Sequence, residues 1–291
     1  MEGHMKRNSA KILITVLAVL LLFSGCINDE KEESTTKPID VSNIDKNSIG
    51  SYKTMQYKYL TGVDVTCLTT NLDKAYLILA NKSNPLGFDY EPTSLTTLTC
   101  ATTYSMQLET RAAQALYAMM AEMNAAGIDD VMVTSAYRSH SYQITLYNKY
   151  IQVEMGCISE DARRVFGEEY IKTNYLDKKI FKLSPEDAHT VVQSYSALPG
   201  QSEHQTGLCI DFITPAMEGK LTEDFENTEA FAWLAENAYK FGFILRYPKG
   251  KEDITGYTYE PWHYRFVGRE AATDIHVGQM TLEQYLQLTA E

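Results

Sequence analysis

Positive charge is scarce in this sequence of 291 residues. Lys and Arg number 26 against 38 Asp and Glu, so the formal net charge at pH 7 is −12. After residue 11 there is no basic run of the kind that binding to a phosphate backbone requires. We therefore expect no nucleic acid as a partner. The hydrophobic fraction, 44%, is ordinary for a protein with a packed core.

The sequence also lacks an apolar run near its start that is long enough to cross a bilayer. The run from Ile12 to Phe23 falls short of the roughly 20 residues that a transmembrane helix needs. Three basic residues precede it, which is typical of a signal peptide. The stretch Leu22 to Cys26 resembles a bacterial lipobox, whose cysteine is lipidated and becomes the mature N-terminus. The alternative is an ordinary secretory signal with a chance cysteine.

These features divide the chain into three parts. Residues 1–26 are predicted to be a lipoprotein signal peptide that ends at the lipidated Cys26. Residues 27–51 are rich in charge, Ser, Thr and Asn, so they bury too little apolar surface to fold and we interpret them as a disordered tether. Residues 52–291 would form one catalytic domain with an N-terminal extension. The predicted location is therefore extracytoplasmic, with the lipid in the outer face of the cytoplasmic membrane.

Cysteine is sparse and forms no recognisable metal or redox motif. Lipidation of Cys26 would leave four cysteines, whose spacings match neither a zinc knuckle nor a CxxC pair: Cys67, Cys100, Cys157 and Cys209. An oxidising exterior permits disulfides. One or two disulfides, or simply buried thiols, are the expected roles.

The folded part alternates helical and extended patterns without an internal repeat. Apolar residues at intervals of three and four predict a helix over 104–126, and Ser184 followed by Pro185 is typical of a helix start. The other expected elements are a strand over 130–136, a helix through 143–150, a strand over 208–213, a helix over 229–241, and extended segments over 243–247 and 257–266. We predict an α+β domain with a mostly antiparallel sheet flanked by helices.

Polar residues suited to chemistry are concentrated in three segments, at 135–143, 199–212 and 259–268. Each lies beside an apolar strand. Asp211 alternates with apolar neighbours inside its predicted strand, and a charge there is costly unless it is paired or bound to a metal. Glu260 and His263 are three residues apart beside a proline that bends or extends the backbone, so both can face one cleft.

Together these residues indicate a catalytic zinc site. His204, Asp211 and His263 provide three ligands of suitable hardness and leave a fourth position for water. Zinc lowers the pKa of such a water to about 7, and Glu260 would take its proton. Arg138 is a candidate to hold a substrate carboxylate or to stabilise an oxyanion.

Several motifs of the sequence resemble those of the VanY-type D-alanyl-D-alanine carboxypeptidases, a group that includes VanX dipeptidases and LdcB-type L,D-carboxypeptidases. The resemblance spans about residues 72–275. It rests on Asn81-Lys82, Asn84-Pro85-Leu86, Asp89-Tyr90 and Pro92, on Ser135 to Ser139 with Gln143, on Ser202 to Leu208 with Asp211, on Arg246-Tyr247-Pro248, and on Glu260-Pro261-Trp262-His263.

The resemblance implies a zinc carboxypeptidase that removes terminal D-alanine from peptidoglycan stem peptides. It implies one zinc ion on His204, Asp211 and His263, with Glu260 as base. The residues that it implies around the terminal D-alanine are Arg138, Gln143, Ser202 and Tyr247. An L,D-carboxypeptidase acting on tetrapeptide stems, a cross-bridge endopeptidase and a non-catalytic wall-binding module remain as alternatives. We expect a monomer.

One position departs from the family pattern. Cys209 stands where the family usually has alanine, and strand alternation places it on the same side as Asp211. It is interpreted as part of the pocket wall, as half of a disulfide with Cys157, or as a soft donor near the metal.

Overall fold

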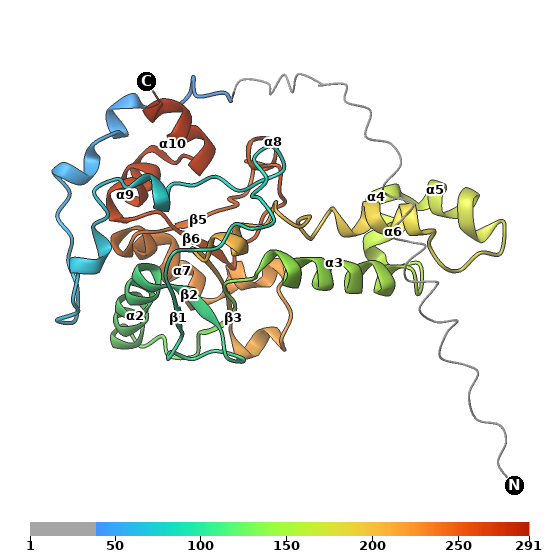
Figure 1. Cartoon of the computed structure of the whole chain (residues 1–291), viewed down its shortest axis with the longest axis horizontal. Coiled ribbons are helices and arrows are strands. Elements are labelled where there is room, and N and C mark those ends of the chain that lie inside the picture. The colour runs from blue at the N-terminus through green and yellow to red at the C-terminus, as the bar shows by residue number, and fades with distance from the viewer. Residues whose placement is uncertain (1–38, 291) are drawn as a thin grey trace, which may run out of the picture. The chain divides into compact units, whose positions relative to one another are not determined.

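Four short strands form the central sheet of the computed structural model, which describes residues 39–290 (Figure 1). In sheet order they are β3 (Met132–Ser135), β4 (Cys209–Ile213), β6 (His263–Phe266) and β5 (Phe243–Leu245). All three neighbouring pairs are antiparallel. A separate antiparallel pair consists of β1 (Leu95–Thr97) and β2 (Gln107–Glu109). The predicted α+β class with an antiparallel sheet is confirmed.

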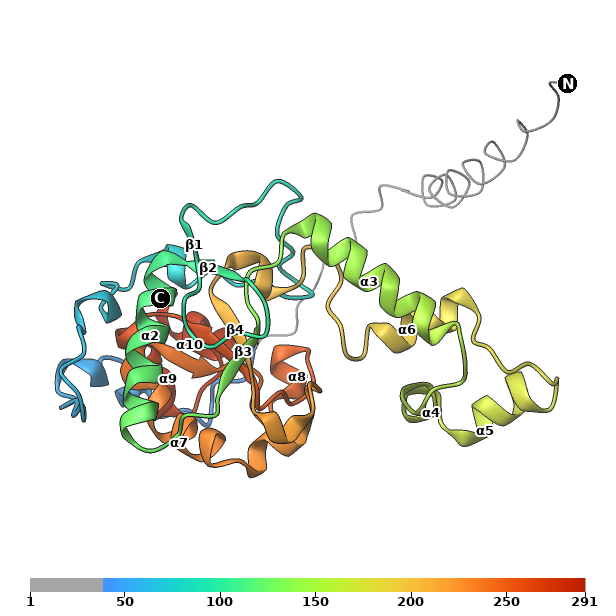
Figure 2. The ribbon, with the colours of Figure 1, turned by 90° about the horizontal axis from the view of Figure 1, so that it is seen from below.

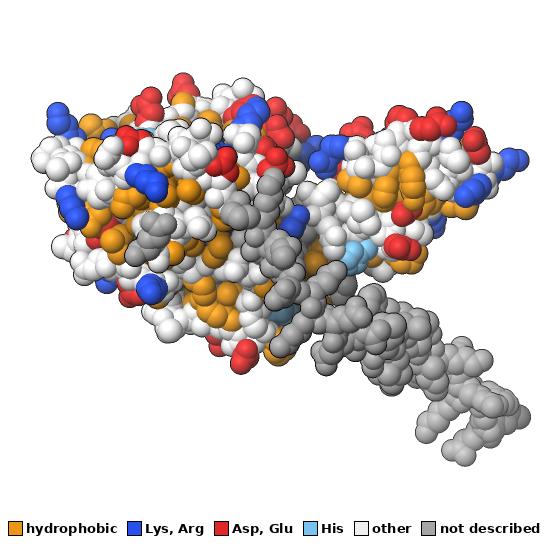
Figure 3. Space-filling model, turned by 90° about the horizontal axis from the view of Figure 1, so that it is seen from above, with side chains coloured by type: hydrophobic (Ala, Val, Ile, Leu, Met, Phe, Trp, Pro, Cys, Tyr) orange, Lys and Arg blue, Asp and Glu red, His pale blue; other side chains and the backbone are white. Residues whose placement is uncertain are grey.

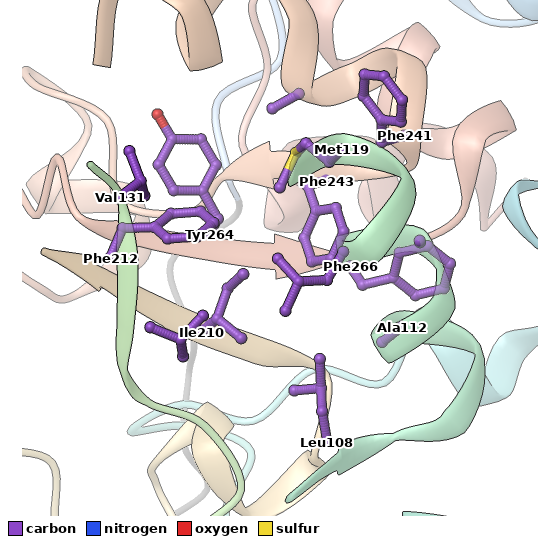
Figure 4. Close-up of a cluster of buried hydrophobic side chains, with 14 of the residues drawn as sticks. Leu108, Ala112, Met119, Val131, Ile210, Phe212, Phe241, Phe243, Tyr264 and Phe266 are labelled. Carbon is purple, nitrogen blue, oxygen red and sulfur yellow. The ribbon is translucent and has the colours of Figure 1, made fainter. Parts of the chain in front are cut away.

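One face of the central sheet carries the main hydrophobic core. Ile210 and Phe212 of β4, and Tyr264 and Phe266 of β6, are fully buried. Figure 4 shows side chains of this face beside residues of helix α2 (Thr110–Ala125), among them Met119. Alternate residues of a strand point to the same face, so these even-numbered positions define the core side.

Cys209 and Asp211 of β4, and His263 and Arg265 of β6, face the opposite side and are polar but buried. Cys209 and Arg265 are register partners, and so are Asp211 and His263. None of the four exposes more than 4% of its surface. Buried polar groups of this kind must be satisfied by partners, so this face is where a functional site is expected.

Helix α2 and the extended segment 257–266 are shorter than predicted. The helix begins at Thr110, not 104, because residues 107–109 pair with β1 and because the side chain of Glu109 accepts hydrogen bonds from two first-turn amides. Of the predicted extended segment 257–266, only residues 263–266 are paired as a strand. The predicted helix over 229–241 is confirmed as α7 (Glu229–Asn237) followed by a 3-10 turn, η9 (Ala238–Phe241).

The end of the predicted tether is part of the folded domain. Ile44 and Ile49 pack against a second hydrophobic cluster that includes helices α9 (Arg269–Gly278) and α10 (Leu282–Thr289). The Gly50 amide donates to the Asp274 carboxylate over 2.8 Å. The boundary at residue 52 is therefore wrong for residues 39–51, because two isoleucines and hydrogen bonds to α9 and α10 attach this segment to the domain. Residues 1–38 lie outside the described part.

A helical lobe is inserted between β3 and β4. It contains α3 (His140–Glu154), α4 (Glu160–Phe166), α5 (Glu168–Ile171), the π-helix η5 (Lys172–Leu176) and α6 (Pro185–Val192). Figures 1 and 2 show α3 leading away from the sheet, with α4 to α6 beside its far end. The predicted start of α6 is confirmed, since the Ser184 side chain accepts from the Asp187 amide.

The lobe surface mixes charged and apolar side chains. Figure 3 shows hydrophobic side chains among acidic and basic ones on the visible face of the lobe. Exposed large apolar residues of the lobe include Val153 and Phe181. A short helix, α8 (Glu252–Thr255), lies between β5 and β6 in the chain. Within residues 39–290, no helix has both the length and the apolar character that a membrane span requires.

Candidate metal and active site

Two residues that pair across the central sheet form the base of the site. Asp211 in β4 and His263 in β6 are register partners, and each exposes at most 4% of its surface. His263 Nδ1 lies 2.8 Å from Asp211 Oδ1. The contact is held in place by strand pairing, because the ladder fixes both side chains on the same face of the sheet.

His204 reaches the same carboxylate from the 3-10 turn η6 (Glu203–Thr206), just before β4. Its Nδ1 lies 2.6 Å from the carbonyl oxygen of Ala136, and its Nε2 lies 3.2 Å from Asp211 Oδ2. The turn ends at Gly207, whose φ of +66° favours glycine. Because the carbonyl group occupies Nδ1, the ring presents Nε2 to Asp211.

Burial and close pairing shift the pKa values of these groups. Burial raises the pKa of Asp211, but the adjacent His204 and His263 outweigh it and hold this pKa well below its usual range. Burial and Arg138 lower the pKa of His204, whereas Cys209 and Asp211 raise it, with a net rise to about 9. The pKa of His263 is also raised, against burial, by Cys209 and Asp211. A cation binding here competes with protons, because histidine ligands must be neutral.

The side chains at this point fit a zinc ion. His204, Cys209 and His263 are buried, and each can offer a ligand atom within 4.8 Å of the other two. Both imidazoles also direct a nitrogen at an oxygen of Asp211. Imidazole nitrogen, carboxylate oxygen and thiolate sulfur are the ligands that zinc takes in proteins. The donor set therefore suits zinc, with Asp211 between the two histidines.

Glu260 lies beside this group at the edge of a cavity. Its Oε2 is 3.8 Å from His263 Nδ1, and its side chain is 18% exposed. Burial raises the pKa of Glu260 to about 7, against the lowering effect of His263. A carboxylate with a pKa near neutrality is suited to accept and return a proton at physiological pH.

The cavity above these residues has a volume of about 550 Å³. Its walls come from the sheet face, from the segment between β5 and β6, and from the helical lobe. The lobe contributes Tyr150, Asp161, Arg164 and residues 195–197, and the segment before β6 contributes Tyr247, residues 257–260 and Trp262. The cavity is large enough for a peptide segment and connects the metal-binding group to the lobe.

Three of the four residues predicted to contact the terminal D-alanine line this cavity, namely Arg138, Ser202 and Tyr247. Arg138 Nη2 lies 3.4 Å from Ser202 Oγ. Tyr247 packs on His263 with ring centroids 4.9 Å apart. Gln143 is not among the lining residues; it is buried and its amide donates to the carbonyl of Ala197 over 2.8 Å. Gln143 therefore supports the cavity wall without facing the cavity.

Comparison with known proteins agrees with this geometry. The sequence matches the family described as VanY: D-alanyl-D-alanine carboxypeptidase over residues 105–269. This match covers more than half of the chain and includes the two histidines, Asp211 and Glu260. The chain belongs to the VanY family.

Relatives of this VanY-family chain include bacterial carboxypeptidases. It is 31% identical over 270 residues to YodJ of Bacillus subtilis (strain 168), named as a carboxypeptidase, covering 89% of this chain and 86% of YodJ. It is 46% identical over 99 residues to a D-alanyl-D-alanine carboxypeptidase of Enterococcus faecalis (strain ATCC 700802 / V583), covering 34% of this chain and 35% of that protein.

Two solved structures share the fold. The LdcB LD-carboxypeptidase aligns with a TM-score of 0.57 and 31% identity, covering 79% of this chain and 92% of LdcB. A variant of the vancomycin resistance D,D-pentapeptidase VanY, in complex with Zn(II), aligns with a TM-score of 0.54 and 31% identity. That match covers 73% of this chain and 99% of the other. The VanY-family chain thus resembles both a D,D- and an L,D-enzyme.

Sequence reasoning missed the charged group that lies behind His263. Glu203 is fully buried and accepts hydrogen bonds from Arg246 and Arg265 over 2.8 and 2.7 Å. The guanidinium groups outweigh the effect of burial and hold the pKa of Glu203 well below its usual range. The sequence does place Glu203 next to the candidate ligand His204. Arg246 and Arg265 lie in other segments, and nothing in the sequence indicates that they pair with Glu203.

Cys209 does not form the disulfide with Cys157 that we considered. Cys209 is buried and Cys157 is exposed, and both carry free thiols. Cys209 is not among the residues that line the cavity. Burial raises the pKa of Cys209, but His204 and His263 outweigh it and lower this pKa to about 7. Its position beside the two histidines favours the interpretation as a sulfur donor.

The different exposure of the two thiols is testable by alkylation. We expect iodoacetamide to modify Cys157 in the native chain while Cys209 is protected until the protein is denatured, because a thiol reacts only where the reagent can reach it. Peptide mass mapping before and after denaturation measures both sites. A cross-linked peptide containing both cysteines in the unreduced protein would contradict the structure.

Proposed function

We propose that this chain is a zinc-dependent carboxypeptidase that removes the C-terminal D-alanine from peptidoglycan stem peptides. One observation carries the proposal. Two buried imidazoles each direct a nitrogen at an oxygen of Asp211, at 3.2 Å for His204 and 2.8 Å for His263, and Glu260 stands beside them at the cavity. Metal ligands and a proton acceptor are thus present in one open site.

In this proposal His204, Asp211 and His263 hold the metal. Bound zinc would supply an activated water and polarise the scissile carbonyl. Glu260 accepts the proton of the attacking water on a carboxylate oxygen and returns it to the nitrogen of the departing D-alanine. Its position beside His263, and its raised pKa, support both transfers.

Arg138 is proposed to bind the free carboxylate of the terminal residue. It lines the cavity close to Ser202, and its Nε is buried without a hydrogen-bond partner in the described part of the chain. A guanidinium group with a free donor can grip a carboxylate through two hydrogen bonds. Such a grip favours cleavage at a chain end over cleavage within a cross-bridge.

Removal of D-alanine from tetrapeptide stems, an L,D-activity, is the second candidate. The observation that favours it is the likeness to the LdcB LD-carboxypeptidase, of which this chain covers 92%. A solved structure of VanYB in complex with D-alanine-D-alanine, at a TM-score of 0.53 and 31% identity, favours the D,D-activity. Glu260 at the site favours catalysis of either kind over a role as a wall-binding module.

A first prediction of the proposed function separates binding the metal from using it. Glu260→Gln preserves the size of the side chain but removes the proton acceptor, so zinc content should be retained while turnover falls about 100- to 10,000-fold. His263→Ala, the matched control, should lose both activity and tight zinc binding. Elemental analysis and steady-state kinetics measure the two effects. An active Glu260→Gln enzyme would defeat the proposed mechanism.

The second prediction concerns the end of the substrate. Amidation of the C-terminus of a stem pentapeptide should abolish cleavage, because the amide removes the charge that Arg138 is proposed to bind. Arg138→Gln should cleave the free peptide poorly and lose the preference for it over the amide. Mass spectrometry of tetrapeptide and pentapeptide digests also separates the L,D- from the D,D-activity. Equal turnover of amidated and free peptides by the native enzyme would indicate an endopeptidase.

We further propose that the protein is held outside the bacterial cytoplasmic membrane by a lipid on Cys26. The motif from Leu22 to Cys26 and the polar segment behind it support this location. The full chain expressed in a bacterial host should incorporate a fatty-acid analogue and sediment with membranes, whereas Cys26→Ser should remain unlabelled. Absence of label in the native chain would reduce Cys26 to an ordinary cysteine.

A further inference from the structure

Four fully buried charged side chains lie behind the proposed metal site. Arg246 donates to Glu283 over 2.9 and 2.6 Å and to Glu203 over 2.8 Å, and Arg265 donates to Glu203 over 2.7 Å. Two carboxylates and two guanidinium groups balance in charge, so the group can be buried at moderate cost. It connects η6 and β6 to helix α10.

The two oxygens of Glu203 have different surroundings. Oε1 accepts from both arginines, whereas Oε2 is buried and accepts no hydrogen bond from any residue in 39–290. Oε2 lies 3.7 Å from Nε2 of His263, which is buried and likewise without a hydrogen-bond partner among those residues. A buried acceptor and a buried ring nitrogen thus face each other, and a shift of less than 1 Å brings them to hydrogen-bond distance.

The other nitrogen of the same ring faces the metal site. His263 Nδ1 lies 2.8 Å from Asp211 Oδ1. A neutral imidazole carries one proton, so Nδ1 can offer a lone pair to a metal only when the proton is on Nε2. Cys209 is also near this ring, and its sulfur is a weaker hydrogen-bond acceptor than a carboxylate oxygen.

We propose that Glu203 is a positioning residue that holds the proton of His263 on Nε2 and so keeps Nδ1 available as a metal donor. The inference rests on the zinc site of the proposed function. The two arginines hold the carboxylate in this orientation, since both bind the oxygen that does not face His263.

The two histidines then differ in tautomer, and each is set by a different acceptor. The carbonyl oxygen of Ala136, 2.6 Å from His204 Nδ1, leaves Nε2 of that ring for the metal. Glu203 has the converse effect on His263. An acceptor of this kind behind a metal-bound histidine fixes the ring and increases its basicity.

The test compares two substitutions of the same type within one buried charge group. Glu203→Gln places an amide opposite His263, and when this amide turns its N–H toward the ring it favours the wrong tautomer. We expect the zinc dissociation constant to rise about 10- to 100-fold. Glu283→Gln alters the same group at its other end, where Glu283 binds Arg246 and makes no hydrogen bond to His263. It should lower stability and leave zinc affinity unchanged.

Zinc affinity is measured on the full chain by competition with a chromophoric chelator, and thermal unfolding of both variants is measured in parallel. A similar weakening of zinc binding in both variants would make the charge group merely structural and overturn the inference. Failure of the native chain to bind zinc would instead overturn the proposed function.

A measurement on the native chain covers the case in which Glu203→Gln does not fold. Nitrogen-15 spectra of labelled histidines in the zinc-loaded protein report which ring nitrogen carries the proton. Only the signals of His204 and His263 remain once the four histidines outside the site are substituted: His4, His140, His189 and His276. One ring with its proton on Nδ1 and the other with its proton on Nε2 supports the inference, and two rings with the proton on Nδ1 overturn it.

Discussion

The sharing of one buried carboxylate by two imidazoles is the constraint on which the site depends. Asp211 exposes only 4% of its surface, and an ionised carboxylate at that depth is unfavourable without partners. Its oxygens are taken by His204 and His263, which come from a turn and from the neighbouring strand. The site therefore depends both on the register of β4 against β6 and on the end of η6 at Gly207, since a change in either would leave one carboxylate oxygen without its partner.

Side chains alternate between the two faces of the central sheet, so one face forms the hydrophobic core and the other carries the site. Ile210 and Phe212 complete the apolar core on one face, while Cys209 and Asp211 lie on the other. Behind the site, the buried charges of Arg246 and Glu283 join the sheet to the C-terminal helix. Removing one partner of such a buried pair typically costs about 3 to 5 kcal/mol. The C-terminal helix thus contributes to the rigidity of a site that it does not touch.

The sequence allowed the site to be predicted better than its surroundings. Polar residues beside apolar strands are costly to bury without a partner, which marked four residues as a candidate site: His204, Asp211, Glu260 and His263. The structure brings all four together. The α+β class and the start of helix α6 followed from local patterns. These signals depend on residues close in the sequence, where periodicity and helix capping act.

Features that depend on distant contacts escaped prediction. The pairing of Glu203 with Arg246 joins residues 43 positions apart, and no local pattern specifies it. Gln143 was expected to face the cavity, but its helix turns it toward Ala197. Residues 39–51 are held by Ile44 and Ile49 and by hydrogen bonds to Asp274 and Gln284. Two isoleucines change the composition of a polar segment too little to predict this contact.

The lobe between β3 and β4 leaves the sheet and returns to it at nearly one point. The backbone amide of Arg138, just before the lobe, donates to the carbonyl of His204, just after it, over 3.0 Å. The two ends of the lobe therefore lie side by side, so its length can change during evolution without disturbing the pairing of β4. Because Tyr150 and Arg164 of the lobe form part of the cavity wall, selection can alter which peptides fit while the metal-binding residues stay constant.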